Sequence, residues 1–443
     1  MTTYMLRFLL ISAFIVLSLA TQARTILVSS LPELEAAVRL NHQTIKMKPG
    51  TYRIAEYLNS DSVQARLLRR EYAYINFSGS HNKIILKNVH FEIDTRLREL
   101  LRHPIHTSEI VVGGQNNLIE GLKITCTGNG LSPGGSVIQV AGNGNRIRNF
   151  DISVRGSFPY GYGDLFGKGG PDVIKHKKHS GFLVTGSNTQ VYGCRLTMRS
   201  YGHGFYIQQN AANIHFENCF VEGETRTTDD VLTETSGPAF DVSFRTWTAN
   251  REGKFIVTPG YTKSLCEDGF RTYGGISNVS FKNCTAKNTR GGFELRTNNG
   301  IRLENCTTIG TERAYWVGNG AIVKNCKGDA AYGPLLFVEG SNVKVDITFV
   351  PTNSDRKVHA LATIQGHNNK VILSKSGKAS EKRQLPILVG YTHPEHGESM
   401  SPYSEGSCTN LYLVNKTGMP VVVGSKAENY EIKPLDSVST GRL

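Results

Sequence analysis

Apolar and polar residues alternate in short runs that recur at a nearly constant interval along the chain. The clearest copies place an Asn-Cys pair after an alternating segment such as Val279–Phe281. These pairs begin 22 and 20 residues apart, at Asn283, Asn305 and Asn325. Alternation with a period of two predicts β-strands, and self-similarity with a period near 20 predicts that the strands stack as the coils of a solenoid.

Weaker copies of the repeat extend upstream, and they indicate what its two central positions do. The slot after the Asn, or after a Gly that replaces it, is always apolar, and it holds Val89, Leu122, Phe150, Cys194 and Cys219 in successive copies. We therefore expect this slot to face the interior. The Asn or Gly position predicts a turn with left-handed backbone, and stacked asparagines would hydrogen-bond to one another along the coils.

With this repeat, the chain resembles the right-handed parallel β-helix (pectin lyase-like) superfamily of exported polysaccharide-active enzymes. Its members include pectate lyases, polygalacturonases and chondroitinase B-type lyases. The resemblance covers residues 27 to about 375. It implies an all-β fold, a single-stranded right-handed parallel β-helix with an N-terminal capping helix and long loop insertions. The scaffold carries several chemistries, so the activity has to be argued from the side chains.

The two ends of the chain are expected to differ from the repeat. Residues 1–23 have the pattern of a signal peptide, which predicts export to the periplasm or the extracellular space and no membrane contact after removal. Residues 24–443 then form one β-helix domain. An amphipathic segment over 32–40 predicts the helix that caps its entry, and strands within about 385–443 are expected to cover the C-terminal end.

Charge and cysteine content refine this prediction. The net charge of +13 favours a polyanionic partner, and an acidic polysaccharide fits an exported protein better than nucleic acid, for which no motif is present. Five of the eight cysteines occupy the inward repeat slot and are expected to be free thiols. The state of Cys126, Cys266 and Cys408 is left open, as is the oligomeric state.

Two long insertions interrupt the repeat, at 157–178 and 223–267. Long loops within a compact repeat are often functional. Because the two insertions leave the solenoid on either side of the coils at 180–222, a cleft is expected around those coils.

A second strand of each coil has its own register, marked by a glycine before an aromatic residue at Gly181, Gly204, Gly269 and Gly292. If the aromatic residues face inward, alternate positions face outward, and coils stack ~4.8 Å apart. The outward positions are rich in arginine and aromatic residues, which predicts a binding face made of Leu183, Tyr206, Gln208, Arg271, Tyr273, Glu294, Arg296 and Trp316.

Another column is interpreted to lie just before these glycines and to consist of His179, His203, Asp268, Arg290 and Arg313. In that alignment His179 and His203 are neighbours on adjacent coils, and both lie beside a long insertion. Histidine can act as a base near neutral pH.

The first functional hypothesis is a polysaccharide lyase that cleaves a uronate-containing polymer by β-elimination. This reaction needs a cation to neutralise the uronate carboxylate, a base to remove the adjacent proton, and an acid for the leaving oxygen. The base would be His203 or His179, and the acid Tyr206. The cation would be Arg271, Lys178 or Arg245, and substrate contacts would come from Gln208, Tyr273, Glu294, Arg296, Trp316, Arg290 and Arg313.

The alternatives are a polygalacturonase-like hydrolase, a uronate epimerase and a non-catalytic carbohydrate-binding solenoid. A hydrolase would use two of the carboxylates Asp229, Asp230 and Glu234. However, this Asp pair follows the segment 202–204, Gly-His-Gly, whereas in that family it precedes it. The same carboxylates could bind calcium, although their spacing is not that of an EF-hand. The sequence indicates no other cofactor.

Overall fold

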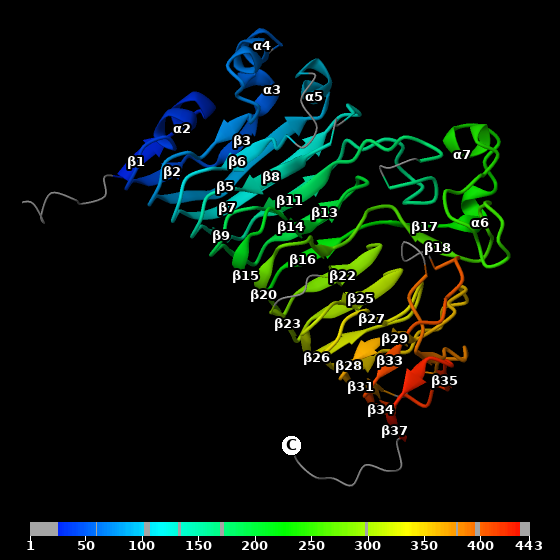
Figure 1. The fold of residues 1–443 in the computed structure, drawn as a ribbon. Coiled ribbons are helices and arrows are strands. Elements are labelled where there is room, and N and C mark those ends of the chain that lie inside the picture. Colours follow the sequence, from blue (N-terminus) through cyan, green and yellow to red (C-terminus); the bar gives the residue numbers. More distant parts are fainter. Residues whose placement is uncertain are drawn as a thin grey trace, which may run out of the picture.

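The computed structural model describes residues 25–434 except 59, 102–106, 132–133, 169–171, 297–299, 378–379 and 395–398. This part of the chain winds into a solenoid of stacked coils, with an N-terminal cap at one end (Figure 1). The predicted signal peptide lies outside the described residues. No helix within them is long and apolar enough to cross a membrane.

One face of the solenoid is a 12-stranded sheet in which every neighbouring pair is parallel. Each coil contributes one strand, because a parallel neighbour is reached only through a long connection. In sheet order the strands are β4 (Ile75–Asn76), β6 (Ile110–Val112), β8 (Ser136–Val140), β11 (Ser180–Val184), β14 (Phe205–Ile207), β19 (Phe270–Thr272), β22 (Gly291–Leu295), β25 (Arg313–Val317), β27 (Leu336–Val338), β29 (Ala362–Ile364), β32 (Ile387–Val389) and β35 (Val421–Val423).

The remaining circumference is a 20-stranded parallel sheet, to which many coils contribute two strands separated by the Asn turn. A short parallel ladder of β30 (Gly366–His367), β33 (Cys408–Thr409) and β36 (Ala427–Glu428) joins the last coils. The strands of the larger sheet are β1 (Thr25–Val28), β2 (Thr44–Met47), β3 (Gly50–Arg53), β5 (Lys83–Asp94), β7 (Leu118–Thr127), β9 (Arg146–Arg148), β10 (Asp151–Val154), β12 (Gln190–Tyr192), β13 (Arg195–Met198), β15 (Ala212–Glu217), β16 (Phe220–Glu222), β20 (Ser277–Lys282), β21 (Thr285–Lys287), β23 (Ile301–Glu304), β24 (Thr307–Ile309), β26 (Ile322–Gly328), β28 (Lys344–Phe349), β31 (Lys370–Lys375), β34 (Tyr412–Lys416) and β37 (Glu431–Pro434).

The Asn-Cys turn has the predicted geometry. Asn283 and Asn305 have φ values of 53° and 54°, and the Asn305 amide donates to the Asn283 side chain at 3.4 Å. The cysteines that follow them are buried and stack on one another along the coils. All eight cysteines are free, which confirms the thiol state predicted for the repeat slot and settles it for the three that were left open.

Aromatic rings fill the interior behind the 12-stranded sheet. Phe205, Phe270, Phe293 and Tyr315 stack with ring centroids 4.7–5.4 Å apart. The glycine before each aromatic residue is required by packing: a Cβ on Gly204 would lie 2.7 Å from both the Gly269 carbonyl oxygen and a Val221 methyl. The Gly-aromatic pair therefore brings the chain close against the core as the strand begins.

The N-terminal end is capped by helices, as predicted. Helix α2 (Leu31–Ala37) begins after Ser30, whose hydroxyl accepts from the Glu33 amide, and it buries Leu31 and Leu34. Three further helices, α3 (Ile54–Tyr57), α4 (Ser60–Leu68) and α5 (Arg96–Leu101), lie at the same end (Figure 1).

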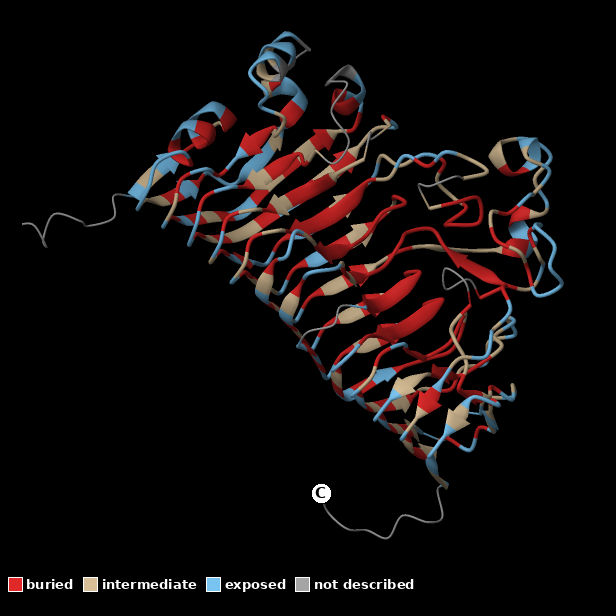
Figure 2. Ribbon diagram, viewed as in Figure 1, coloured by how far each residue is buried: buried red, intermediate tan, exposed pale blue. Residues whose placement is uncertain are grey.

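The two insertions project together from one side of the solenoid (Figure 1). The second contains the antiparallel pair β17 (Thr225–Thr227) and β18 (Thr262–Ser264), and the helices α6 (Thr228–Val231) and α7 (Pro238–Asp241). Tyr162, Leu165 and Phe166 of the first insertion share a small apolar core with Val231 and residues near it. Figure 2 shows buried segments within these loops. They are therefore packed structures.

The C-terminal strands continue the solenoid as its last coils: β32 and β35 extend the 12-stranded sheet, and β34 and β37 extend the larger one. These coils lack the Asn-Cys pair, but they keep inward apolar positions such as Val389 and Leu413, which are buried.

Candidate active site

The outward side of the 12-stranded sheet carries an unbroken column of register partners. Between β4 and β27 it has one residue per coil: Asn76, Val111, Gln139, Leu183, Tyr206, Arg271, Glu294, Trp316 and Phe337. The predicted alignment of this column agrees with the observed pairing. Because coils stack at ~4.8 Å, a linear polymer could contact several of these positions at once.

His203 lies beside this column with its imidazole held between a tyrosine and two carboxylates. Its Nε2 is 2.6 Å from the hydroxyl of Tyr273, and its Nδ1 is 3.3 Å from Asp268 Oδ2. Glu267 Oε2 lies 3.5 Å from Nε2. His203 is 6% exposed and Tyr273 is half-buried. The hydroxyl of Tyr273 thus contacts one side of the imidazole, and Asp268 lies on the other side.

The two carboxylates beside His203 are ionised at neutral pH. Burial acts to raise the pKa of Glu267, but the charges of His203, Lys178 and Arg290 outweigh it and lower it to about 2. Burial acts in the same way on Asp268, and Arg290 together with His203 and Arg313 holds its pKa well below the usual range. The contact between His203 Nε2 and the Tyr273 hydroxyl is compatible with the tautomer that carries its proton on Nδ1, on the side of Asp268, and in that tautomer Nε2 accepts from Tyr273.

The two tyrosines that flank His203 are neutral phenols. Burial raises the pKa of Tyr273, and the charge of Glu267 adds to the effect. Burial also raises the pKa of Tyr206 to about 12, against hydrogen bonds from Ser136 and Ser180. The ring centroids of Tyr206 and Tyr273 lie 5.5 and 5.7 Å from that of His203. Two hydroxyls that can exchange protons therefore border one histidine.

The predicted pairing of His179 with His203 is wrong by one residue. The register partners of Phe182 and Phe205 place Ser180 opposite His203. A shift of one residue turns a side chain to the other side of the strand. His179 accordingly points inward: it is 0% exposed, it lies 3.5 Å from Glu109, and burial holds its pKa well below the usual value. It cannot contact a substrate.

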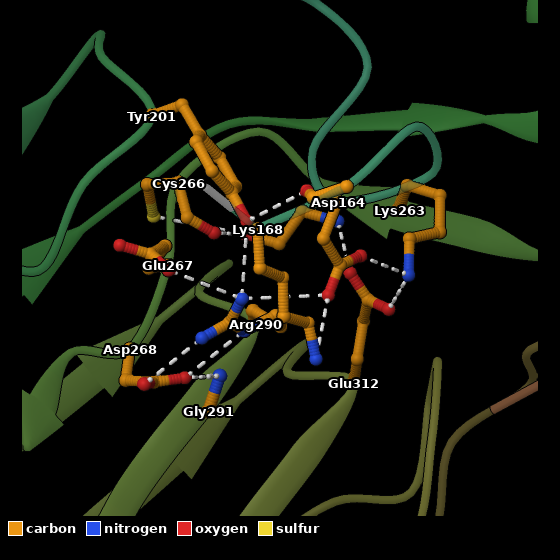
Figure 3. A network of polar contacts seen from close by, with 12 residues as sticks. Asp164, Lys168, Tyr201, Lys263, Cys266, Glu267, Asp268, Arg290, Gly291 and Glu312 are labelled. Atoms are coloured by element: carbon orange, nitrogen blue, oxygen red, sulfur yellow. Dashed lines mark hydrogen bonds and ion pairs between the residues drawn. The ribbon is translucent and has the colours of Figure 1, made fainter. Parts of the chain in front are cut away.

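The predicted placement of Arg290 is wrong by the same one-residue shift. Arg290 belongs to a buried ionic network and not to a binding surface. Its guanidinium contacts Asp268 at 3.1 Å, Glu267 at 3.3 Å and the Tyr201 hydroxyl at 3.2 Å. Figure 3 shows that this network continues through Asp164 of the first insertion to the buried pair of Lys263 and Glu312, which are 2.5 Å apart. Arg290 therefore fixes the carboxylates that support His203, and it ties the insertions to the same coils.

Three arginines surround Glu294. Arg271 contacts it, Arg296 lies 2.6 Å away and Arg313 lies 2.8 Å away. Glu294 and Arg313 are buried and were predicted as substrate contacts, so this expectation is corrected for both. Arg296 is exposed and Arg271 is half-buried. Burial lowers the pKa of Arg271 to about 10, which leaves it charged at neutral pH.

Trp316 does not form the predicted sugar-stacking surface. It is 1% exposed, because the ring of His393 packs on it at a centroid distance of 4.0 Å and Phe337 packs on another side. Its indole nitrogen donates to Glu339 at 2.7 Å. The segment that contains His393 comes from a late coil, and the spacing of the repeat contains no signal for it. The open part of the face therefore ends near Arg296.

The other predicted residues are divided between the site and the insertions. Lys178 lies 2.8 Å from Glu267, and Gln208 is half-buried and immediately follows β14. Arg245 is exposed in the second insertion, just beyond α7. The structure thus brings His203, Tyr206, Tyr273, Arg271 and Lys178 to one region and leaves Arg245 in the loop.

The carboxylates proposed for hydrolysis or calcium binding are engaged elsewhere. Asp229 accepts from Arg356 and from the Gly260 amide, both at 3.0 Å. Glu234 accepts from Arg226 at 2.7 Å and from the hydroxyl of Tyr162 at 2.9 Å. Asp230 is exposed at the surface of α6. These side chains do not converge on a calcium site, and no metal-binding group of three or more His, Cys, Asp or Glu side chains occurs in the ranges that the structure describes.

Sequence reasoning missed the importance of Glu267 and underrated Tyr273. Glu267 and Asp268 immediately precede Gly269, and His203 immediately precedes Gly204. The signal in the sequence was therefore an acidic pair just before one strand, with a histidine just before the neighbouring strand. Tyr273 was placed on the correct face, but its 2.6 Å contact with His203 joins residues of two coils, and periodicity does not predict such a distance.

Comparison with known proteins supports the fold. No family model matches the chain, and no curated protein matches its sequence. Among solved structures, the N-terminal fragment of gene product 12 of bacteriophage Phi29 is similar with a TM-score of 0.50 and 14% identity, over 88% of this chain and 60% of that one. The fold is that of a right-handed parallel β-helix.

Two lyase structures are similar at lower scores. One is a PL6 alginate lyase in complex with a trisaccharide, with a TM-score of 0.48 and 10% identity over 94% of this chain and 86% of that one. The other is a mannuronic acid specific polysaccharide family 6 lyase from human gut microbiota, with a TM-score of 0.43 and 11% identity over 93% and 91%. At these identities the likeness concerns the fold alone.

Proposed function

We propose that the protein is an exported polysaccharide lyase that cleaves an acidic, uronate-containing polymer by β-elimination. The observation that carries the proposal is the 2.6 Å contact between His203 Nε2 and the Tyr273 hydroxyl, next to the charged guanidinium of Arg271. Arg271 lies 4.7 Å from the centre of the Tyr273 ring. A proton acceptor and a carboxylate-binding cation are thus adjacent, as the reaction requires.

The residues can perform the reaction with a closed proton balance. Arg271, with Arg296 at the rim, binds the uronate carboxylate and makes the neighbouring C–H more acidic. The Tyr273 oxygen takes this proton while its own proton passes to His203 Nε2. The electron pair of the C–H bond forms the new double bond as the bond to the glycosidic oxygen breaks. Tyr206 donates its proton to this leaving oxygen and is left as a phenolate, whereas Tyr273 is already a phenol again. The extra proton on His203 then passes through solvent to Tyr206, which restores both residues.

Hydrolysis by this site is disfavoured by its electrostatics. A glycoside hydrolase needs one carboxylic acid that stays protonated near neutral pH. The pKa of Glu267 is about 2 and that of Asp268 is also lowered, so both are acceptors only. The predicted carboxylates Asp229 and Glu234 are bound by Arg356 and Arg226. Elimination uses no carboxylic acid and is compatible with this arrangement.

The test is to incubate the purified protein with alginate, pectate, chondroitin and heparinoid polymers. We expect at least one of them to yield products with the ultraviolet absorbance of an unsaturated uronate, and we expect His203→Ala to abolish it. New reducing ends without that absorbance would mean hydrolysis. Exchange of solvent deuterium into the intact polymer, again without absorbance, would mean epimerisation by the same proton abstraction. Either outcome overturns the lyase assignment.

A further inference from the structure

A cleft of about 700 Å³ lies on the same face as His203, at the N-terminal end of the 12-stranded sheet. Its floor includes Asn76, Val111 and Gln139, which are members of the outward column that leads to Tyr206. Gln139 is two coils from Tyr206 and Asn76 is four, which corresponds to ~10 and ~19 Å along the solenoid axis at ~4.8 Å per coil. The cleft and the proposed site therefore lie along one column of register partners, in which Leu183 and Tyr206 are 6% and 7% exposed.

The cleft lies at one end of this column. β4 is the edge strand of the sheet, so the column has no further member beyond Asn76. The wall on that side is made of residues that precede β4: Glu35, Arg39, Arg66, Arg70, Glu71, Tyr72 and Ala73. Arg66 holds the wall together, because it contacts Glu35 at 2.6 Å and donates to the Tyr74 carbonyl oxygen at 3.1 Å. A polymer that lies along the column meets this wall.

The wall presents positive charge to the cleft. Glu35 is bound by both Arg39 and Arg66, each at 2.6 Å, and Glu71 is bound by Arg69 at 3.2 Å. The acidic residues of the lining are therefore neutralised. Arg39 and Arg70 are exposed, and guanidinium groups bind carboxylates in bidentate fashion. On the floor, the Gln139 side chain is oriented by hydrogen bonds with Ser108 and Thr185, so an amide is held in place for a sugar hydroxyl.

We propose that the polysaccharide lies along this column and that the cleft is its terminal subsite, which binds the anionic end of the chain through Arg39 and Arg70. This inference rests on the proposed function. Its consequence is the mode of attack: the wall stops the chain end, so the bond beside Tyr206 and Tyr273 is a fixed, short distance from that end. The enzyme then releases short products of uniform size from the start of the reaction, in place of a ladder of lengths.

The first experiment measures binding without turnover. Acidic oligosaccharides are titrated calorimetrically into the Tyr273→Phe variant, alone and combined with Arg39→Ala and Arg70→Ala. Each substitution is expected to weaken affinity about tenfold, since it removes one charge-assisted contact. The matched control removes two exposed arginines from the 20-stranded sheet, Arg146→Ala and Arg302→Ala, and keeps the same net charge as the double variant. Equal weakening by both pairs would overturn the subsite and leave only a general charge effect.

The second experiment separates this inference from the proposed function. Product lengths are measured on a long polymer in the first few per cent of conversion. The subsite is supported if the native protein forms short products of uniform length and the Arg39→Ala, Arg70→Ala variant forms a ladder of lengths. A ladder already formed by the native protein overturns it and leaves the lyase assignment intact. If the Arg39→Ala, Arg70→Ala variant loses binding and the control pair does not, but the native protein cleaves no polymer, the subsite stands and the lyase assignment is overturned.

Discussion

Removal of the Tyr273 hydroxyl should affect chemistry without disturbing the fold. It is half-buried at the end of a strand, and its partner is His203. We expect Tyr273→Phe to lower kcat by about 10²–10⁴-fold, the usual contribution of a positioned acid or base, with little change in KM. The control is Tyr192→Phe on the 20-stranded sheet, whose hydroxyl donates to Gln190. Initial rates of both variants are measured on the polymer that the native protein cleaves. If Tyr273→Phe retains half of the native kcat, Tyr273 takes no part in the reaction.

Gly204 allows the chain next to His203 to pack closely against the neighbouring coil because it has no side chain. It follows His203, and its position has no space for a Cβ atom because Gly269 and Val221 are each 2.7 Å away. We expect Gly204→Ala to lower the free energy of unfolding by about 1–3 kcal/mol through overpacking. Gly274→Ala, where a Cβ meets nothing within 4 Å, should change it by less than about 0.5 kcal/mol. Urea denaturation of both variants tests this, and equal effects would contradict the packing argument.

At the scale of elements, the sequence predicts the parts that repeat and fails where the repeat is interrupted. The Asn turn, the stacked cysteines and the outward column follow from the requirement that equivalent positions touch. His179 was misplaced because two adjacent residues can both precede a glycine-aromatic pair, and only the strand pairing determines which one faces out. The burial of Trp316 under His393 depends on a contact between distant coils, which no local pattern encodes.

The second insertion is held to the solenoid by a contact that should be sensitive to acid. His359 Nε2 lies 2.7 Å from the Tyr261 hydroxyl, and burial lowers the pKa of His359 to about 4, with Arg251 and Lys357 contributing. The unfolded chain binds this proton near pH 6.5, so it takes up more protons than the folded state between these values. The stabilising contribution is therefore fully present above pH ~6.5 and is lost as the pH falls through about 4.

The corresponding variant is His359→Gln, which cannot titrate. We expect the native protein to lose more free energy of unfolding than this variant between pH 7 and pH 4, measured by urea denaturation. The same loss in both proteins would show that His359 does not contribute to the acid sensitivity.

At the scale of the whole molecule, the solenoid converts a linear repeat into a linear groove. Each coil adds one position to the outward column, so a polymer can be contacted along its length by residues that are far apart in the sequence. The two ends of the open face are closed in different ways: residues before β4 form a wall at one end, and the His393 segment covers Trp316 at the other. The net charge of +13 favours the approach of anionic chains to the protein.

Because each coil contacts only its neighbours, the solenoid should open first at an end. The buried free cysteines report on this, since they are distributed from Cys126 in β7 to Cys408 in β33. Cys408 lies in the last coils, whereas Cys284 is stacked between Cys219 and Cys306 in the middle. We expect a thiol-reactive dye, applied in mild denaturant and followed by peptide mass spectrometry, to label Cys408 at least about tenfold faster than Cys284, as expected for regions of lower local stability. Simultaneous labelling would mean that the coils unfold as one cooperative unit, and earlier labelling of Cys284 would contradict the nearest-neighbour account of its stability.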